Sequence, residues 1–152
     1  DLVSRLLKVL VAKPDVQVLT AIYQYKGAPH APKLYRFGKD FKDFNILGKW
    51  DIPNTDRTGG KYLVPVDLAG AGCLLVRREV FERMSKRFKE EPFEITPPYG
   101  EDNSFFLRLK KLGIQAYCDP TIEYHHLEYK EVSMKDFDAE SLTYKKHRLL
   151  VK

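Results

Sequence analysis

The segment from Glu101 to Cys118 places a helical pattern, a stop signal and a strand-like run one after another. Apolar residues recur at helical spacing over 101–112, Gly113 follows directly, and residues 114–118 form a short, largely apolar run. A glycine at this position is typical of a helix C-terminus, and a strand that follows it at once indicates helices layered on a sheet. The segment therefore predicts an α/β layered fold.

The same alternation extends along the rest of the chain. The patterns predict helices over 1–12, 78–88 and 101–112, a final helix that begins with a capping box at 133–136, and strands over 16–22, 61–67, 73–76, 114–118 and 121–126. Several of these strands have no helix between them, which indicates a mixed sheet, and Pro65 indicates an edge or a bulge. We expect one domain over residues 1–152.

Composition narrows the class of protein. With 152 residues, 43% of them hydrophobic, the chain is long enough for one globular core. A net charge of +5 favours anionic partners, although a mixed solvated surface explains it as well. Cys73 and Cys118 each lie in a strand-like run, which favours buried free thiols in a reducing compartment; a disulfide between them stays open. No apolar run has membrane-spanning length, so we expect a cytoplasmic location, with the cytoplasmic membrane face as the alternative.

Two adjacent carboxylates begin the helix at 101–112. Glu101 and Asp102 follow Gly100 in its first turn. A helix N-terminus carries partial positive charge and free N–H groups, which keeps carboxylates there ionised, as a general base requires. Taken alone, the pair has a simpler role as helix caps.

Three other places carry candidate functional residues. Asp67 ends a strand before the small-residue turn Gly70-Ala71-Gly72, His125 and His126 follow a strand, and Trp50 lies in a polar loop. The two histidines and two cysteines are zinc-ligand types, but they lack closely spaced ligand pairs. Without further context, His125 has an exposed or packing role, His126 a hydrogen-bonded structural role, and Trp50 a role in anchoring its loop.

Three segments in this order resemble one enzyme family: 66–81 with the small-residue turn, 100–113 with the acidic pair, and 117–127 with the histidines. The set resembles the C-terminal, acceptor-side half of inverting glycosyltransferases with the GT-A (Rossmann-like) fold, of the family-2 type. The resemblance covers residues 1–127, and residues 128–152 are expected to form a C-terminal helical extension.

The resemblance implies roles for each candidate. Asp102 would be the general base that deprotonates the acceptor hydroxyl, supported by Glu101. Asp67 and the turn Gly70-Ala71-Gly72 would lie beside the donor sugar, and Trp50 would contact the acceptor. His126, with His125 as second choice, would bind a divalent metal, Mn²⁺ or Mg²⁺, which is a suitable ion for such ligands. The partners would be a nucleotide-diphosphate sugar and a hydroxyl-bearing saccharide or other acceptor.

The family's N-terminal nucleotide-binding half, which ends in an Asp-x-Asp motif, has no counterpart in residues 1–152. At ~30 residues per βαβ unit, roughly 60–90 residues would be missing. We therefore expect a partial GT-A domain that is a fragment or is completed by another chain. Alone, we expect it neither to bind a nucleotide sugar tightly nor to turn over. An incomplete sheet also predicts self-association through an exposed edge.

Two other classes of function stay open. One is a non-catalytic scaffold or binding domain with the same fold. The other is a single-stranded nucleic-acid-binding module, because tyrosines and phenylalanines alternate with lysines and arginines over 23–44. The chain has no RNP or OB-like pattern, and we expect no DNA partner.

Overall fold

The computed structural model describes residues 1–25, 30–38, 43–48, 51–52, 62–127, 131–132, 134 and 147–148. At 43–44, 126–127, 131–132 and 147–148 the description covers the backbone only. Within these ranges the helices are α1 (Leu2–Ala12), α3 (Arg78–Phe88) and α4 (Glu101–Lys111). The strands are β1 (Val18–Ile22), β2 (Leu34–Phe37), β3 (Asp43–Ile46), β4 (Val64–Val66), β5 (Leu68–Ala69), β6 (Leu74–Val76), β7 (Ala116–Glu123), β8 (His126–Leu127), β9 (Glu131–Val132) and β10 (His147–Arg148). None of these helices is long and apolar enough to cross a bilayer.

A mixed four-stranded sheet forms the centre of the fold, with strand order β4-β7-β1-β6. Strands β1 and β7 are parallel, and Val18 pairs with Ala116. Strands β6 and β4 run antiparallel to their neighbours. The predicted mixed sheet is therefore confirmed, and Pro65 lies in β4 at the edge of this sheet, where a missing N–H is tolerated.

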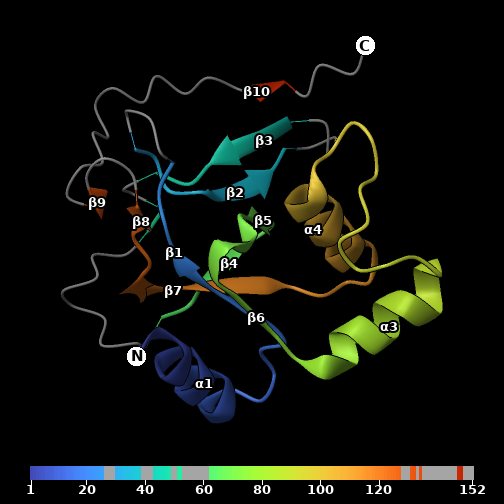
Figure 1. Cartoon of the computed structure of the whole chain (residues 1–152), viewed down its shortest axis with the longest axis horizontal. Coiled ribbons are helices and arrows are strands. Elements are labelled where there is room, and N and C mark those ends of the chain that lie inside the picture. The colour runs from blue at the N-terminus through green and yellow to red at the C-terminus, as the bar shows by residue number, and fades with distance from the viewer. Residues whose placement is uncertain are drawn as a thin grey trace.

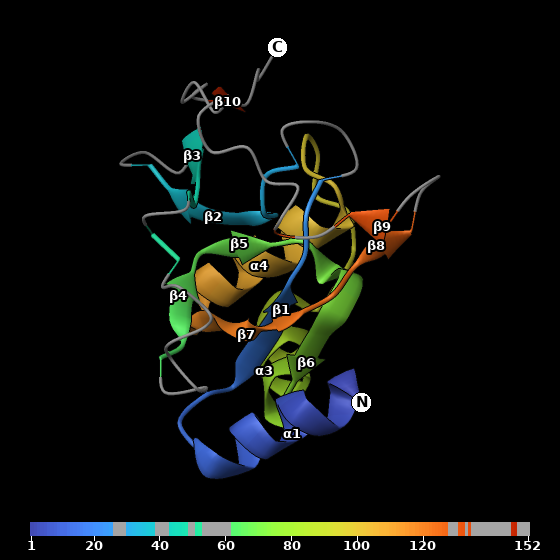
Figure 2. The ribbon, with the colours of Figure 1, turned by 90° about the vertical axis from the view of Figure 1, so that its left-hand side faces the viewer.

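Strand β1 is buried along its whole length because it separates two apolar clusters. Leu19 and Ala21 pack with Leu6 of α1, whereas Val18 and Ile22 belong to the larger cluster that includes α3 and α4. Alternate residues of a strand point to opposite faces of its sheet, so one strand serves both clusters. Figures 1 and 2 show α1 on one side of the sheet and α4 on the other.

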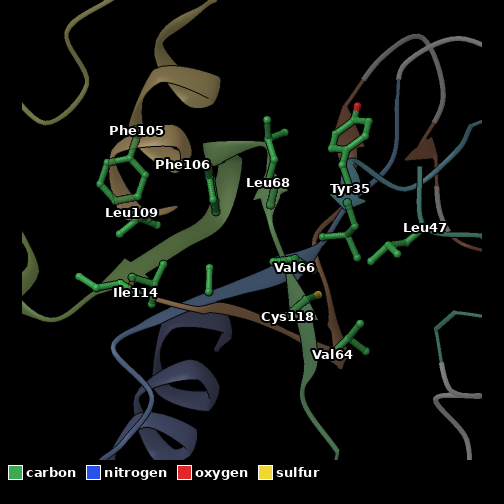
Figure 3. Close-up of a cluster of buried hydrophobic side chains, with 14 of the residues drawn as sticks. Tyr35, Leu47, Val64, Val66, Leu68, Phe105, Phe106, Leu109, Ile114 and Cys118 are labelled. Atoms are coloured by element: carbon green, nitrogen blue, oxygen red, sulfur yellow. The ribbon is translucent and has the colours of Figure 1, made fainter. Parts of the chain in front are cut away.

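A second, antiparallel sheet has the order β10-β3-β2-β5, and β5 packs against α4. Helix α4 buries the apolar face predicted from its sequence, with Phe105, Phe106 and Leu109 all at 1% exposure or less. Figure 3 shows these side chains in one cluster with residues of β4 and β5, including Leu68. Helix α4 therefore packs against both sheets through this cluster.

The helix ends agree with the sequence signals. Asp1 caps α1, because its Oδ1 accepts the N–H of Ser4 at 2.8 Å. Helix α3 begins at Arg78 and ends at Phe88 as predicted. Gly113 has a φ of +67°, which is the left-handed conformation expected of the residue that ends a helix.

Three features differ from the prediction. The strands expected at 114–118 and 121–126 are one strand, β7, which passes through Pro120 because its register with β1 shifts there, from Ala21 opposite Asp119 to Ile22 opposite Glu123. The hairpin of β2 and β3 was not predicted. At His147–Arg148 the backbone pairs with β3 as a strand instead of ending the final helix; apart from Met134, the rest of that predicted helix lies outside the described residues.

Candidate functional site

Tyr23 follows β1 and occupies the space beside the small-residue turn. The ring is 5% exposed. A Cβ added to Gly70 would lie 1.7 Å from the Tyr23 hydroxyl oxygen, and one added to Gly72 would lie 3.2 Å from the ring carbon Cζ. The close approach that these glycines permit is therefore made by a side chain of the protein itself.

The charge of Asp102 influences the pKa of the same tyrosine. Asp102 is half-buried in the first turn of α4. Burial raises the pKa of the Tyr23 hydroxyl to about 12, the Asp102 charge contributes to the rise, and a hydrogen bond from the Gly72 N–H opposes it. Burial also raises the pKa of the Tyr35 hydroxyl, and its hydrogen bond with the Tyr25 hydroxyl adds to the rise.

The end of β7 reaches Tyr23 from another side. The Tyr124 N–H donates to the Ile22 carbonyl at 2.7 Å. The Tyr124 ring meets the Tyr23 ring edge-on, with centroids 6.2 Å apart and an interplanar angle of 83°. The Lys33 ammonium lies 5.5 Å from the Tyr23 ring centroid and 5.0 Å from that of Tyr25. Tyr23 thus contacts the small-residue turn and Tyr124, which precedes the histidines, and the charge of Asp102 contributes to the raised pKa of its hydroxyl.

A polar cluster follows Tyr124. His125 Nε2 lies 3.7 Å from Glu123 Oε2, and Glu123 Oε1 accepts hydrogen bonds from Gln24 Nε2 at 3.0 Å and from the Met134 N–H. The His126 side chain lies outside the described residues. Where side chains are described, no three His, Cys, Asp or Glu residues gather to hold a metal ion. His125 and Glu123 alone would be an incomplete ligand set.

Not every predicted site residue joins this neighbourhood. Asp67 lies beside the other end of α4, where its carboxylate pairs with Lys110 Nζ at 3.0 Å and accepts the Phe37 N–H at 3.1 Å. Lys110 and Asp102 are separated by about 12 Å of helix at 1.5 Å per residue. Asp67 therefore connects β2 with α4 through these two interactions. Glu101 lies in the same turn of α4 as Asp102, and its side chain is exposed. Trp50 lies outside the described residues.

Arg108 fixes the chain segment that leads into the acidic pair. Its buried guanidinium donates to the Glu94 carbonyl at 2.8 Å and to Thr96 Oγ1 at 3.1 Å, and it pairs with Glu90 Oε2 at 2.6 Å. The Thr96 N–H in turn donates to Ser104 Oγ at 2.9 Å. The connection from α3 to α4 is therefore fastened along α4 itself, which sets where Glu101 and Asp102 begin.

The structure places both cysteines and part of the aromatic set over 23–44 that supported alternative functions; Phe41 and the Phe44 side chain lie outside the described residues. Cys73 and Cys118 are free thiols, and burial raises the pKa of both. Tyr23 and Tyr35 are buried, so their ring faces are not available for stacking on nucleic-acid bases. Tyr25 remains 39% exposed.

The sequence patterns pointed to Tyr23 and Lys33 only as part of an aromatic and basic surface for nucleic acid, and they did not point to Glu123. The available signal was that Tyr23 directly follows a strand of apolar residues, and such a position places a side chain at a sheet end. No family model, no curated protein and no solved structure compared with this chain matches it. The family resemblance of the three segments stays a prediction.

Proposed function

We propose that this chain is the acceptor-side part of an inverting glycosyltransferase of the GT-A type, with Asp102 as the general base. The observation that carries the proposal is the convergence around Tyr23. The Gly70–Gly72 turn and Tyr124 at the end of β7 contact this side chain, and the charge of Asp102 contributes to the raised pKa of its hydroxyl. These are the three segments on which the family resemblance rests.

The proposed reaction transfers a sugar from a nucleotide-diphosphate donor to an acceptor hydroxyl. Asp102 takes the proton from that hydroxyl while the oxygen forms a bond to the anomeric carbon. The bond between that carbon and the diphosphate oxygen breaks on the opposite face, so the configuration inverts and the nucleoside diphosphate leaves. The half-buried setting of Asp102 suits a base that must meet a substrate hydroxyl within hydrogen-bond reach.

A divalent metal, Mn²⁺ or Mg²⁺, would supply positive charge to the leaving diphosphate in the complete enzyme. His126 is the proposed ligand from this chain, with His125 beside Glu123 as the second choice. The further ligands would come from the Asp-x-Asp motif of the nucleotide-binding half. The steps assigned to Asp102 do not depend on which histidine binds.

The test is Asp102→Asn in the full-length gene product. Loss of a general base lowers kcat by about 10²–10⁴-fold. Donor binding, measured by calorimetry with uridine and guanosine diphosphate sugars, should stay unchanged because the carboxylate acts on the acceptor. Asp15→Asn makes the same chemical change in the exposed turn after α1 and should leave turnover as it is. Full activity in Asp102→Asn would refute the assignment of the base.

A further inference from the structure

We propose that a cavity between α4 and the connection at 89–100 is a second binding site, which takes a small carboxylate with one aromatic ring. The cavity has a volume of about 270 Å³. Figure 1 shows the connection, in yellow, beside α4. We call this space the connection cavity, and its walls include Phe88 of α3, Thr96 and Tyr99 of the connection, and Ser104, Leu107 and Lys111 of α4.

The connection cavity lies on the side of α4 that faces away from Asp102. The α4 residues that line it occupy positions 104, 107, 108 and 111, which share one helix face. At 3.6 residues per turn, the centre of that face is about 170° from Asp102 around the helix axis. The site is therefore separate from the proposed transfer site, and it can be tested whether or not the chain transfers sugars.

The volume of the cavity limits the size of its ligand. An engineered cavity of about 150 Å³ in another protein holds benzene, whereas drug-sized ligands occupy pockets of about 300–1,000 Å³. A space of about 270 Å³ therefore suits one ring with a single polar substituent. The ring has apolar and aromatic neighbours to pack against, because Phe88, Tyr99 and Leu107 line the cavity and are only partly buried.

Arg108 gives the connection cavity a fixed polar wall. Its buried guanidinium pairs with Glu90 Oε2 at 2.6 Å and donates to Thr96 Oγ1 at 3.1 Å and to the Glu94 carbonyl at 2.8 Å. A buried charge with this many partners is held in one position, and the Glu90 carboxylate compensates its charge. Arg108 therefore shapes the site without adding to its net charge.

Lys111 supplies the charge that selects the ligand. Its side chain is exposed one turn beyond Leu107 and Arg108. No ion pair between described residues involves Lys111. Once Arg108 and Glu90 cancel, the charged residues that line the cavity leave one positive charge. A carboxylate carries one negative charge at neutral pH, whereas a phosphate monoester carries about 1.5–2, so the carboxylate is the better match.

The first test is a titration of the full-length gene product with sodium benzoate, followed through the backbone amide signals by two-dimensional NMR. Saturable shifts should concentrate at the residues that line the connection cavity, with a Kd of about 1 mM, because so small a ligand binds weakly. Benzamide keeps the ring without the charge, so its Kd should be about two- to fivefold higher. Equal Kd values for both probes, shifts confined to other residues, or no saturation up to about 20 mM would each overturn the proposal.

The second test locates the site with variants. Lys111→Met should raise the Kd of benzoate about two- to fivefold, since an exposed ion pair contributes modestly. Lys8→Met makes the same chemical change on the exposed face of α1 and should leave that Kd unchanged. Leu107→Trp fills the cavity and should abolish binding in a variant whose circular dichroism shows it to be folded; if it does not fold, Lys111→Met decides. An unchanged Kd in Lys111→Met, or in folded Leu107→Trp, would refute the site.

Discussion

Gly70→Ala should destabilise the protein more than any ordinary glycine-to-alanine change. The new Cβ would lie 1.7 Å from the Tyr23 hydroxyl oxygen and 2.6 Å from Cζ. Gly70 has a φ of −74° and a ψ of 148°, which alanine adopts without strain, so the whole cost comes from the clash. The variant must either strain the turn or expel the ring from its buried site.

The magnitude follows from these two routes. Overpacking of a rigid site costs about 1–3 kcal/mol, and loss of a buried aromatic ring costs about 3–5 kcal/mol. The cheaper route should prevail, near the upper end of its range because the contact is so short. Because alanine reduces the conformational entropy of the unfolded chain, it adds about 0.4–1 kcal/mol to the free energy of unfolding. The net decrease in that free energy is therefore about 2–3 kcal/mol. For a chain of this size the melting temperature should fall by about 4–12 °C.

Gly72→Ala is the matched control. Its Cβ would lie 3.2 Å from Tyr23 Cζ, so a shift of a few tenths of an ångström relieves the contact. We expect Gly72→Ala to lower the free energy of unfolding by less than about 1 kcal/mol. Urea unfolding followed by circular dichroism measures both variants on one scale. If Gly70→Ala unfolds within about 0.5 kcal/mol of the wild type, Tyr23 does not pack against the turn as described.

Two further predictions concern pH and a buried cation. The pKa of the Tyr23 hydroxyl is about 12 in the folded state and 10.0 in the unfolded chain. The stability linked to this proton is therefore fully present below pH 10 and is lost as the pH rises toward 12. Urea unfolding at pH 9 and pH 11 should show a loss of about 1 kcal/mol in the free energy of unfolding, since one pKa unit corresponds to about 1.4 kcal/mol, and Tyr23→Phe should remove that part of the pH dependence. Arg108→Met should lower the free energy of unfolding by about 1–3 kcal/mol in the same assay. The reason is that the Glu94 carbonyl and Thr96 Oγ1, both in the connection from α3 to α4, lose their hydrogen-bond donor. Arg78→Met, which breaks the exposed pair with Glu82, is its control and should cost less than about 0.5 kcal/mol; equal losses would contradict a fastening role for Arg108.

The sequence predicts those parts of the fold that local rules decide. Helices α3 and α4 could be read because their apolar residues repeat at helical spacing and because Gly113 provides a conformation that other residues avoid. Two strands were predicted at 114–118 and 121–126, yet β7 continues through Pro120, and only the position of β1 shows that the register shifts there. The β2–β3 hairpin carries interleaved aromatic and charged residues, a pattern that does not distinguish a strand from a loop.

Some residues of the candidate site could also be predicted from the sequence, and others could not. Asp102 and the Gly70–Gly72 turn could be selected from motif and residue type. Tyr23 could not, because its contacts with Gly70 join positions that only the folded sheet brings together. Asp67 illustrates the opposite case: its closeness in sequence to Gly70 suggested a shared site, but the chain turns between β4 and β5 and directs the carboxylate to Lys110.

The pairing of β1 with β7 has a consequence for how the chain reaches its native state. Val18 meets Ala116, so the innermost strand receives its parallel neighbour only from the last third of the chain. Until then β1 has no partner on that flank, and a long loop must close before its apolar side chains are covered. We therefore expect folding that is slow for the size of the protein. During synthesis on the ribosome, the edge of β1 that pairs with β7 should stay unpaired, and prone to capture by chaperones, until β7 has emerged.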